Sequence, residues 1–180
     1  EDIVAMLALY RPGPLDAGMV DDYIQVKHGA KVRYPHQMLE EILKPTNGVF
    51  LYQEQVMKSA QIMAGYSLGG ADILRRAMGK KKTKEMAQQR EVFVKGAAKK
   101  NIDKDKANEI FDLIDKFSGY GFNKSHSVAY AYISYQTAWL KAHYPAPFMA
   151  AVLSSVMDDT DRIAFTVVEA KKKGIKIIAQ

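Results

Sequence analysis

The sequence predicts an all-α protein of about eight helices, with at most one short strand at its C-terminal end. Apolar residues recur every three or four positions along most of the 180 residues, and breaks rich in proline or glycine separate these segments. A β-branched run at 175–178 is the single strand candidate. Because 48% of the residues are hydrophobic, the chain can bury a core, and we expect 1–180 to form one helical domain.

Three short helices are expected in the N-terminal part of the chain. Their ranges are 2–9, 16–27 and 38–43. Arg11-Pro12-Gly13-Pro14 should stop the first helix, because proline lacks an amide hydrogen and disfavours a helical conformation in the residue before it. Thr46-Asn47-Gly48 has the composition of a turn.

Four amphipathic helices are expected next, over 52–64, 67–78, 83–100 and 103–118, with Thr83 and Asp103 as the N-caps of the last two. Gly119-Tyr120-Gly121 should end the fourth. The residues predicted to face the core are Val56, Ala60, Met63, Met86, Val92 or Phe93, Ala97, Ile110, Leu113, Ile114 and Phe117.

A long aromatic helix is expected at 125–143, with Ser125 as its N-cap, and two further helices at 147–157 and 160–173. Aromatic residues recur along and just after the long helix: Tyr130, Tyr132, Tyr135, Trp139 and Tyr144. Such a row can stack on nucleic-acid bases. The same spacing is typical of a buried helix face, and we favour core packing for most of them.

Composition excludes several classes of site. The chain has no cysteine, which rules out disulfides and thiolate metal sites and fits a cytoplasmic protein. Its four histidines are scattered and its acidic residues form no converging set, so we predict no metal site. No apolar run approaches the roughly 20 residues that span a bilayer. Since the chain starts on Glu1 without a methionine, we expect a fragment of a longer protein.

The positive charge is concentrated in one basic subregion, residues 74–106. This stretch contains twelve lysines and arginines and four acidic residues, a net charge of +8, whereas the whole chain carries +6. An excess of this kind favours a polyanionic partner. A lysine run can also be a solvated face that only aids solubility.

The centre of this subregion is the sequence LRRAMGKKK, residues 74–82. Arg75 and Arg76 lie about 100° apart on a helix, and Gly79 ends that helix so that the following lysines can turn toward them. Arginine binds phosphate oxygens through two nitrogens, and lysine adds point charge. Favourable interaction of these cations with the C-terminal end of the helix dipole is the alternative explanation. No Walker A loop is present, because Lys81 stands where Ser or Thr is required.

A second candidate site is the sequence GYGFNKSHS, residues 119–127. It places Asn123, Lys124, Ser125 and His126 at a helix N-terminus, where free amides attract anions. Simple helix capping is the competing explanation.

Several long strings, in order, resemble the bacterial family C replicative DNA polymerases, the alpha subunits of DNA polymerase III. These strings are ALYRPGPLDAGMVDDYI, GVFLYQEQVM, AGYSLGGADILRRAMGKKK, GYGFNKSHSVAYA and SYQTAWLKAHYPAPFMAAVLSS. The resemblance implies the fingers domain of such an enzyme. It further implies primer-template DNA, deoxynucleoside triphosphates, the remaining polymerase domains and holoenzyme subunits as partners. Magnesium would be held by palm aspartates that this chain lacks, so no catalytic residue is expected here and the fragment alone should be inactive.

Residue by residue, the resemblance places the triphosphate of the incoming nucleotide on Arg75, Arg76 and Lys80. It places Asn123, Lys124, Ser125 and His126 near the nucleotide or the template. Lys81, Lys82 and Lys84 are candidate contacts to the DNA backbone. Arg11 and the pair Gln53-Glu54 also match the family, with scaffold contacts as their expected role.

Two other functions remain open from sequence. The chain can be a non-catalytic helical module that grips only the DNA backbone, with salt-sensitive affinity of its own. It can also be a structural segment whose lysines serve only solubility.

Overall fold

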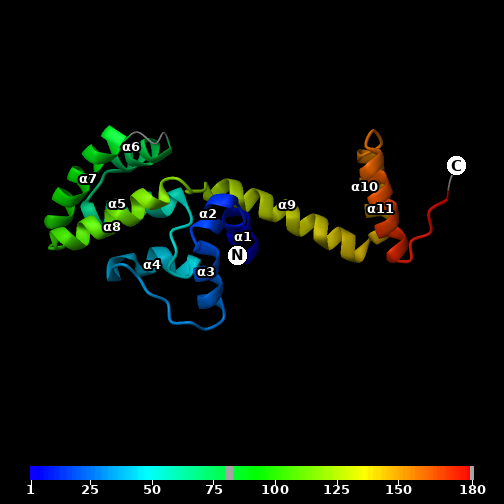
Figure 1. Cartoon of the computed structure of the whole chain (residues 1–180), viewed down its shortest axis with the longest axis horizontal. Helices are drawn as coiled ribbons and strands as arrows, with labels where there is room; N and C mark the ends of the chain where they lie inside the picture. The colour runs from blue at the N-terminus through cyan, green and yellow to red at the C-terminus, as the bar shows by residue number, and fades with distance from the viewer. Residues whose placement is uncertain (80–82, 179–180) are drawn as a thin grey trace. The chain divides into compact units, whose positions relative to one another are not determined.

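The computed structural model describes residues 1–79 and 83–178. This described part contains eleven α-helices, two short 3₁₀ segments and no sheet, which confirms the all-α prediction with more helices than expected (Figure 1). The strand candidate at 175–178 does not form a strand. A strand needs a neighbouring strand for its hydrogen bonds; here the amide of Ile175 instead donates to the carbonyl of Ala170, at the end of the last helix.

The chain divides into two compact units, Glu1–Ala129 and Tyr130–Gln180. Helix α9 (Lys124–His143) contributes residues to both. The expectation of one domain over 1–180 stays a prediction.

The core of the first unit is built from four helices: α5 (Gln53–Ala64), α6 (Leu68–Gly79), α7 (Thr83–Ala98) and α8 (Lys104–Phe117). Helix α5 packs against α6 and α7, and α7 packs against α8 (Figure 1). Gly96 permits the close approach of α7 to α5, because a Cβ atom there would lie 2.0 Å from the carbonyl oxygen of Ala64. Asp103 caps α8 as predicted, its Oδ2 accepting from the amides of Asp105 and Lys106.

Most of the predicted core residues are buried in this cluster, with two informative differences. Phe93 is fully buried and Val92 is half-exposed, so the aromatic residue is the inward one on α7. On α8, Leu113 is wrong as a core residue because it is 37% exposed, whereas Phe111 is fully buried. The ring centroids of Phe93 and Phe111 lie 5.5 Å apart. The two phenylalanines are buried in place of Val92 and Leu113 because the larger side chains fill the space between α7 and α8.

The N-terminal segment of the same unit consists of short helices. They are α1 (Asp2–Leu9), α2 (Pro12–Asp16), α3 (Met19–Lys27), η1 (Gln37–Leu39), α4 (Glu40–Leu43) and η2 (Lys44–Thr46). Pro12 does not simply stop the chain's first helix but begins a new one, because proline is tolerated in a first helical turn. The residue that separates α2 from α3 is Gly18, at a φ of 72°.

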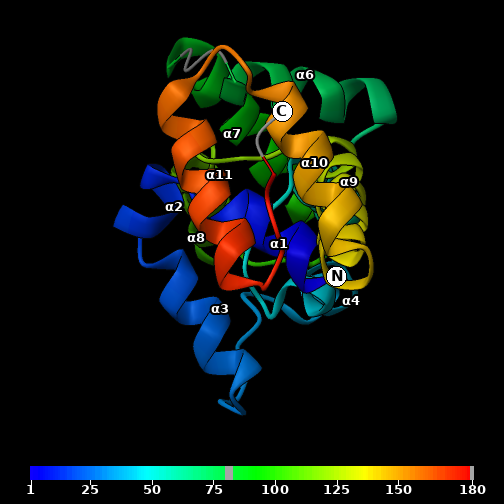
Figure 2. The same cartoon turned by 90° about the vertical axis from the view of Figure 1, so that its right-hand side faces the viewer.

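The second unit contains the end of α9, α10 (Pro145–Ser155) and α11 (Thr160–Lys172). Helices α10 and α11 lie side by side (Figure 2). Lys141 of α9 forms an ion pair with Glu169 of α11 at 2.6 Å. No helix in the described residues is long and apolar enough to cross a membrane.

The aromatic row on α9 does not pack into the core. Its members Tyr130, Tyr132, Tyr135, Trp139 and Tyr144 are all between 43% and 64% exposed, so the core-packing interpretation is wrong. The ring centroid of Trp139 lies 4.5 Å from that of His143, one helical turn later, and 5.7 Å from that of Tyr144, the N-cap of α10.

Candidate functional site

The arginine pair lies on the exposed face of α6. Ala71, Leu74, Ala77 and Met78 form the buried stripe of this helix, so the positions between them point outward. The side chain of Arg75 is 37% exposed and that of Arg76 is 68% exposed. Both side chains therefore keep solvent-accessible surface, that of Arg76 more than that of Arg75.

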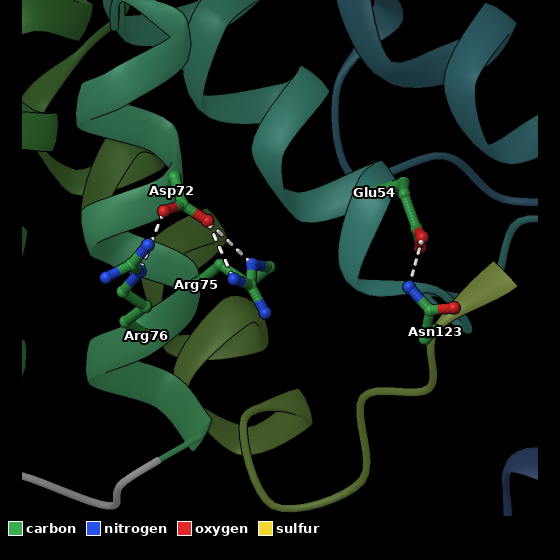
Figure 3. Close-up of polar contacts among 5 residues, drawn as sticks. All are labelled: Glu54, Asp72, Arg75, Arg76 and Asn123. Atoms are coloured by element: carbon green, nitrogen blue, oxygen red, sulfur yellow. Dashed lines mark hydrogen bonds and ion pairs between the residues drawn. The ribbon is translucent and has the colours of Figure 1, made fainter. Parts of the chain in front are cut away.

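Both arginines bind one acidic residue, Asp72, one helical turn before them (Figure 3). Nε and Nη2 of Arg75 donate to Oδ1 at 2.9 and 2.8 Å, and Nε of Arg76 donates to Oδ2 at 2.8 Å. Long helical side chains lean toward the N-terminus, which brings residues at i+3 and i+4 onto the same neighbour. The hydrogen bond from Arg75, supported by the charge of Arg76, lowers the pKa of Asp72 below its ordinary value.

Asp72 is absent from the residues predicted from sequence. The pattern Asp-x-x-Arg-Arg carried the signal, because an acid three and four positions before two arginines shares one helix face with both. The two guanidinium groups also do not splay apart freely, as their 100° separation suggested, but converge on this carboxylate.

The predicted lysines have different outcomes. Lys80, Lys81 and Lys82 lie outside the described residues. Lys84 is exposed in the first turn of α7. Their assignments to the triphosphate and the DNA backbone stay predictions.

Part of the positive charge of the basic subregion stabilises the fold. Arg90 forms an ion pair with Asp112 at 2.6 Å, approaches Asp115 at 3.7 Å, and its guanidinium carbon lies 4.8 Å from the centroid of the Phe111 ring. Such a cation attached to both α7 and α8 is a structural residue. Two more cations form pairs within one helix, Lys95 with Glu91 and Lys106 with Glu109.

The loop before α9 is fixed by residues distant in sequence. Arg11 donates from Nη2 to the carbonyl of Tyr120 at 2.7 Å, and its guanidinium carbon lies 4.5 Å from the centroid of the Phe122 ring. Gln53 donates its amide to the carbonyl of Phe122 at 2.9 Å and its side chain to that of Gly121 at 3.3 Å. These contacts confirm the scaffold role expected for Arg11 and Gln53.

The second candidate site surrounds the first turn of α9. Asn123 accepts the amide of His126 on Oδ1 at 2.8 Å, so Asn123 is the N-cap and the prediction of Ser125 as the cap is wrong. The helix begins at Lys124, one residue earlier than expected, because the asparagine side chain can accept that amide. Glu54 supplies a second acceptor, because its carboxylate accepts a hydrogen bond from Nδ2 of Asn123 at 2.9 Å (Figure 3). The same carboxylate accepts the backbone amide of Lys124 at 3.1 Å.

The amides that could attract an external anion at this helix start are thus partly satisfied by Glu54, a carboxylate of the protein. The side chains themselves remain at the surface: Asn123, Lys124, Ser125 and His126 are all exposed. Lys124 Nζ lies 5.6 Å from the centroid of the Tyr52 ring, and the His126 ring meets the edge of Phe122 at 5.6 Å.

The two sets of predicted residues are held separately. Arg75 and Arg76 are bound to Asp72 of their own helix, whereas Asn123 and Lys124 are bound to Glu54 of α5. The described part of the chain also contains no group of three or more histidine, aspartate or glutamate side chains placed to hold a metal ion.

The fold and the site together define an all-α chain in which two neighbouring arginines of one helix bind the same carboxylate. Residues 1–101 match the family model for the finger domain of the bacterial DNA polymerase III alpha subunit. The chain belongs to this family. It is 60% identical over 185 residues to DNA polymerase III subunit alpha of Pseudomonas fluorescens, 58% identical over 184 residues to that of Vibrio cholerae and 57% identical over 184 residues to that of Escherichia coli K12.

These alignments cover 99% of this chain and 16% of each relative. The chain therefore spans about one sixth of the length of the curated relatives it matches.

Proposed function

We propose that this chain is the fingers part of a replicative DNA-directed DNA polymerase and that Arg75 and Arg76 bind the triphosphate of the incoming deoxynucleotide. Membership of the finger-domain family supports the first part. The observation that supports the second is the placement on α6 of two adjacent guanidinium groups, one partly and one largely exposed by side chain, that bind the same carboxylate. Two such groups match the several oxygens of a triphosphate better than isolated lysines do.

The chemistry proposed for these arginines is electrostatic. Negative charge increases on the leaving phosphates when the α-phosphorus is attacked, and fixed guanidinium groups stabilise that charge without transferring a proton. Magnesium would contribute the same stabilisation from the part of the polymerase outside this chain. We accordingly assign no catalytic residue to this chain, and we expect it to be inactive alone.

The remaining assignments follow from the same proposal. Lys80 would add charge at the triphosphate, and Lys81, Lys82 and Lys84 would contact the DNA backbone. Asn123, Lys124, Ser125 and His126 would lie near the nucleotide or the template. The partners would be primer-template DNA, deoxynucleoside triphosphates and the other domains and subunits of a cytoplasmic replicative polymerase.

Single-nucleotide incorporation by the full-length polymerase that contains this chain tests the arginine assignment. Arg75→Ala and Arg76→Ala should each raise the KM for the deoxynucleotide and lower kcat, reducing kcat/KM by about tenfold or more, since a charged hydrogen bond to phosphate is lost. Lys100→Ala is the control, because it removes one exposed charge from the same basic subregion. Kinetics near those of the wild type in both arginine variants would contradict the assignment. Weakened DNA binding with an unchanged nucleotide KM would instead favour a module that grips only the backbone.

A further inference from the structure

Asp72 makes the arginine pair a geometrically defined unit. Its two carboxylate oxygens are divided between the arginines, Oδ1 with Arg75 and Oδ2 with Arg76 (Figure 3). This arrangement contacts only one edge of each guanidinium group. The hydrogen bonds to Asp72 leave out Nη1 of Arg75 and both Nη1 and Nη2 of Arg76.

The free nitrogens are those needed for an external anion. Arginine has five donors in a planar fork, so a group bound through its Nε edge still offers its outer edge to two oxygens. Without an anchor, both side chains would sample many rotamers, and their like charges would favour conformations that separate them. The Asp72 carboxylate between them reduces this repulsion and holds the two guanidinium groups beside each other on α6.

We propose that Asp72 is the positioning residue of the triphosphate site: it orients Arg75 and Arg76 for phosphate binding without contacting the nucleotide. This inference rests on the function proposed above. Asp72 does cancel one of the two positive charges, but orientation compensates, because an ordered pair loses less conformational freedom when the phosphate binds. An acid that merely occupied the site of the phosphate would have the opposite effect on affinity.

The test is nucleotide incorporation by the full-length polymerase carrying Asp72→Ala. We expect the KM for the deoxynucleotide to rise by about three- to tenfold, with a smaller decrease in kcat, because the change loosens the arginines but removes no group that touches phosphate. Asp72→Glu should restore part of the affinity, since a glutamate at the same position still reaches residues three and four positions later. Asp72→Asn should remain impaired, because an amide offers one acceptor for two arginines.

Glu91→Ala is the matched control. It removes another surface acid that pairs with a cation four residues later, Lys95, and it should leave the KM unchanged. Thermal unfolding of each variant separates positioning from a general loss of structure.

A double-mutant cycle distinguishes this inference from the proposed function. In an Arg75→Ala/Arg76→Ala background, Asp72→Ala should have no further effect on KM, since there is nothing left to orient. If the arginine variants raise KM but Asp72→Ala leaves it unchanged or lowers it, the positioning role is overturned and the triphosphate assignment stands. If the arginine variants themselves leave KM unchanged, the triphosphate assignment has failed and this inference fails with it.

Discussion

Glu54 and Asn123, 69 residues apart in sequence, are joined by a hydrogen bond of 2.9 Å from Asn123 Nδ2 to Glu54 Oε1. The same carboxylate accepts the amide of Lys124, the first residue of α9. A side chain of α5 thereby fixes the point where α9 begins. Of the pair Gln53-Glu54, both members are scaffold residues for the loop that precedes this helix.

Glu54→Ala should therefore destabilise the fold by about 1 kcal/mol, the usual contribution of a helix cap. The substitution leaves the amide of Lys124 and the side chain of Asn123 without their acceptor. Thermal or urea unfolding of the chain measures the loss. Glu41→Ala, at an exposed position of α4, is the control and should change stability by no more than a few tenths of a kcal/mol. Equal stability of the two variants would argue against a capping role.

Gly96→Ala should be strongly destabilising for a different reason. A methyl group there would overlap the carbonyl of Ala64 at 2.0 Å, so α5 and α7 would have to separate. Overpacking of this kind costs about 1–3 kcal/mol. In Gly69→Ala, the added methyl on α6 meets no atom within 4 Å, and we expect unchanged or slightly raised stability. Denaturant midpoints compare the two, and similar midpoints would show that the helices can adjust.

Two tyrosines should ionise unusually late. Burial raises the pKa of Tyr52 to about 12 and that of Tyr66 to about 12. In an ultraviolet titration, Tyr52→Phe should reduce the amplitude of the transition near pH 12 to the part that Tyr66 contributes, whereas Tyr10→Phe, at a residue that is 76% exposed, should leave that amplitude unchanged.

The same shift has a consequence for stability at high pH. A pKa that is raised in the folded state favours the protonated tyrosine, so this contribution is fully present below about pH 10 and is lost as the pH rises toward 12. The free energy of unfolding should decrease between pH 10 and pH 12, and this decrease should be smaller in Tyr52→Phe than in the wild type. An identical decline in wild type and variant would contradict the assignment.

The pKa of the Asp72 carboxyl group should lie below its ordinary value, because Arg75 and Arg76 stabilise its charged form. Its contribution to stability is present above that value and is lost as the pH falls through the lower, folded-state pKa. Carbon-13 NMR of the side-chain carboxyl follows the titration directly. Arg75→Ala/Arg76→Ala should move the pKa of Asp72 upward, and Lys100→Ala should leave it where it is. No upward movement in the double variant would mean that the ion pairs do not persist in solution.

The helical class was predictable because its signals are local. Apolar spacing located α5, α6, α7 and α8 to within a few residues, and the cap at Asp103 followed from the residue type alone. The choice between Val92 and Phe93 was left open, and the prediction of Leu113 as a core residue, with Phe111 overlooked, was wrong. Both points are decided by which side chains fill the space between α7 and α8, and that depends on the facing helix.

The candidate site divides in the same way. The arginine pair was predicted from two adjacent residues of the sequence. Asp72 was missed, although it was predictable in principle because it lies on the same helix as the two arginines. The role of Glu54 was not, because nothing near residue 123 indicates an acceptor from a segment 69 residues earlier. The exposure of the aromatic row on α9 was also hidden, since a row of large side chains has the same spacing whether or not another element covers it.

The sequence by itself determined an all-α chain, its main breaks, its basic subregion and the arginine pair, because each depends on residues within one or two helical turns. Only the tertiary structure decided which aromatic residues are buried, how α5 approaches α7 at Gly96, and which carboxylate holds the start of α9. The physical reason is the range of the interactions. Backbone hydrogen bonds and capping act between near neighbours, whereas packing and long-range hydrogen bonds depend on residues that meet only when the chain has folded.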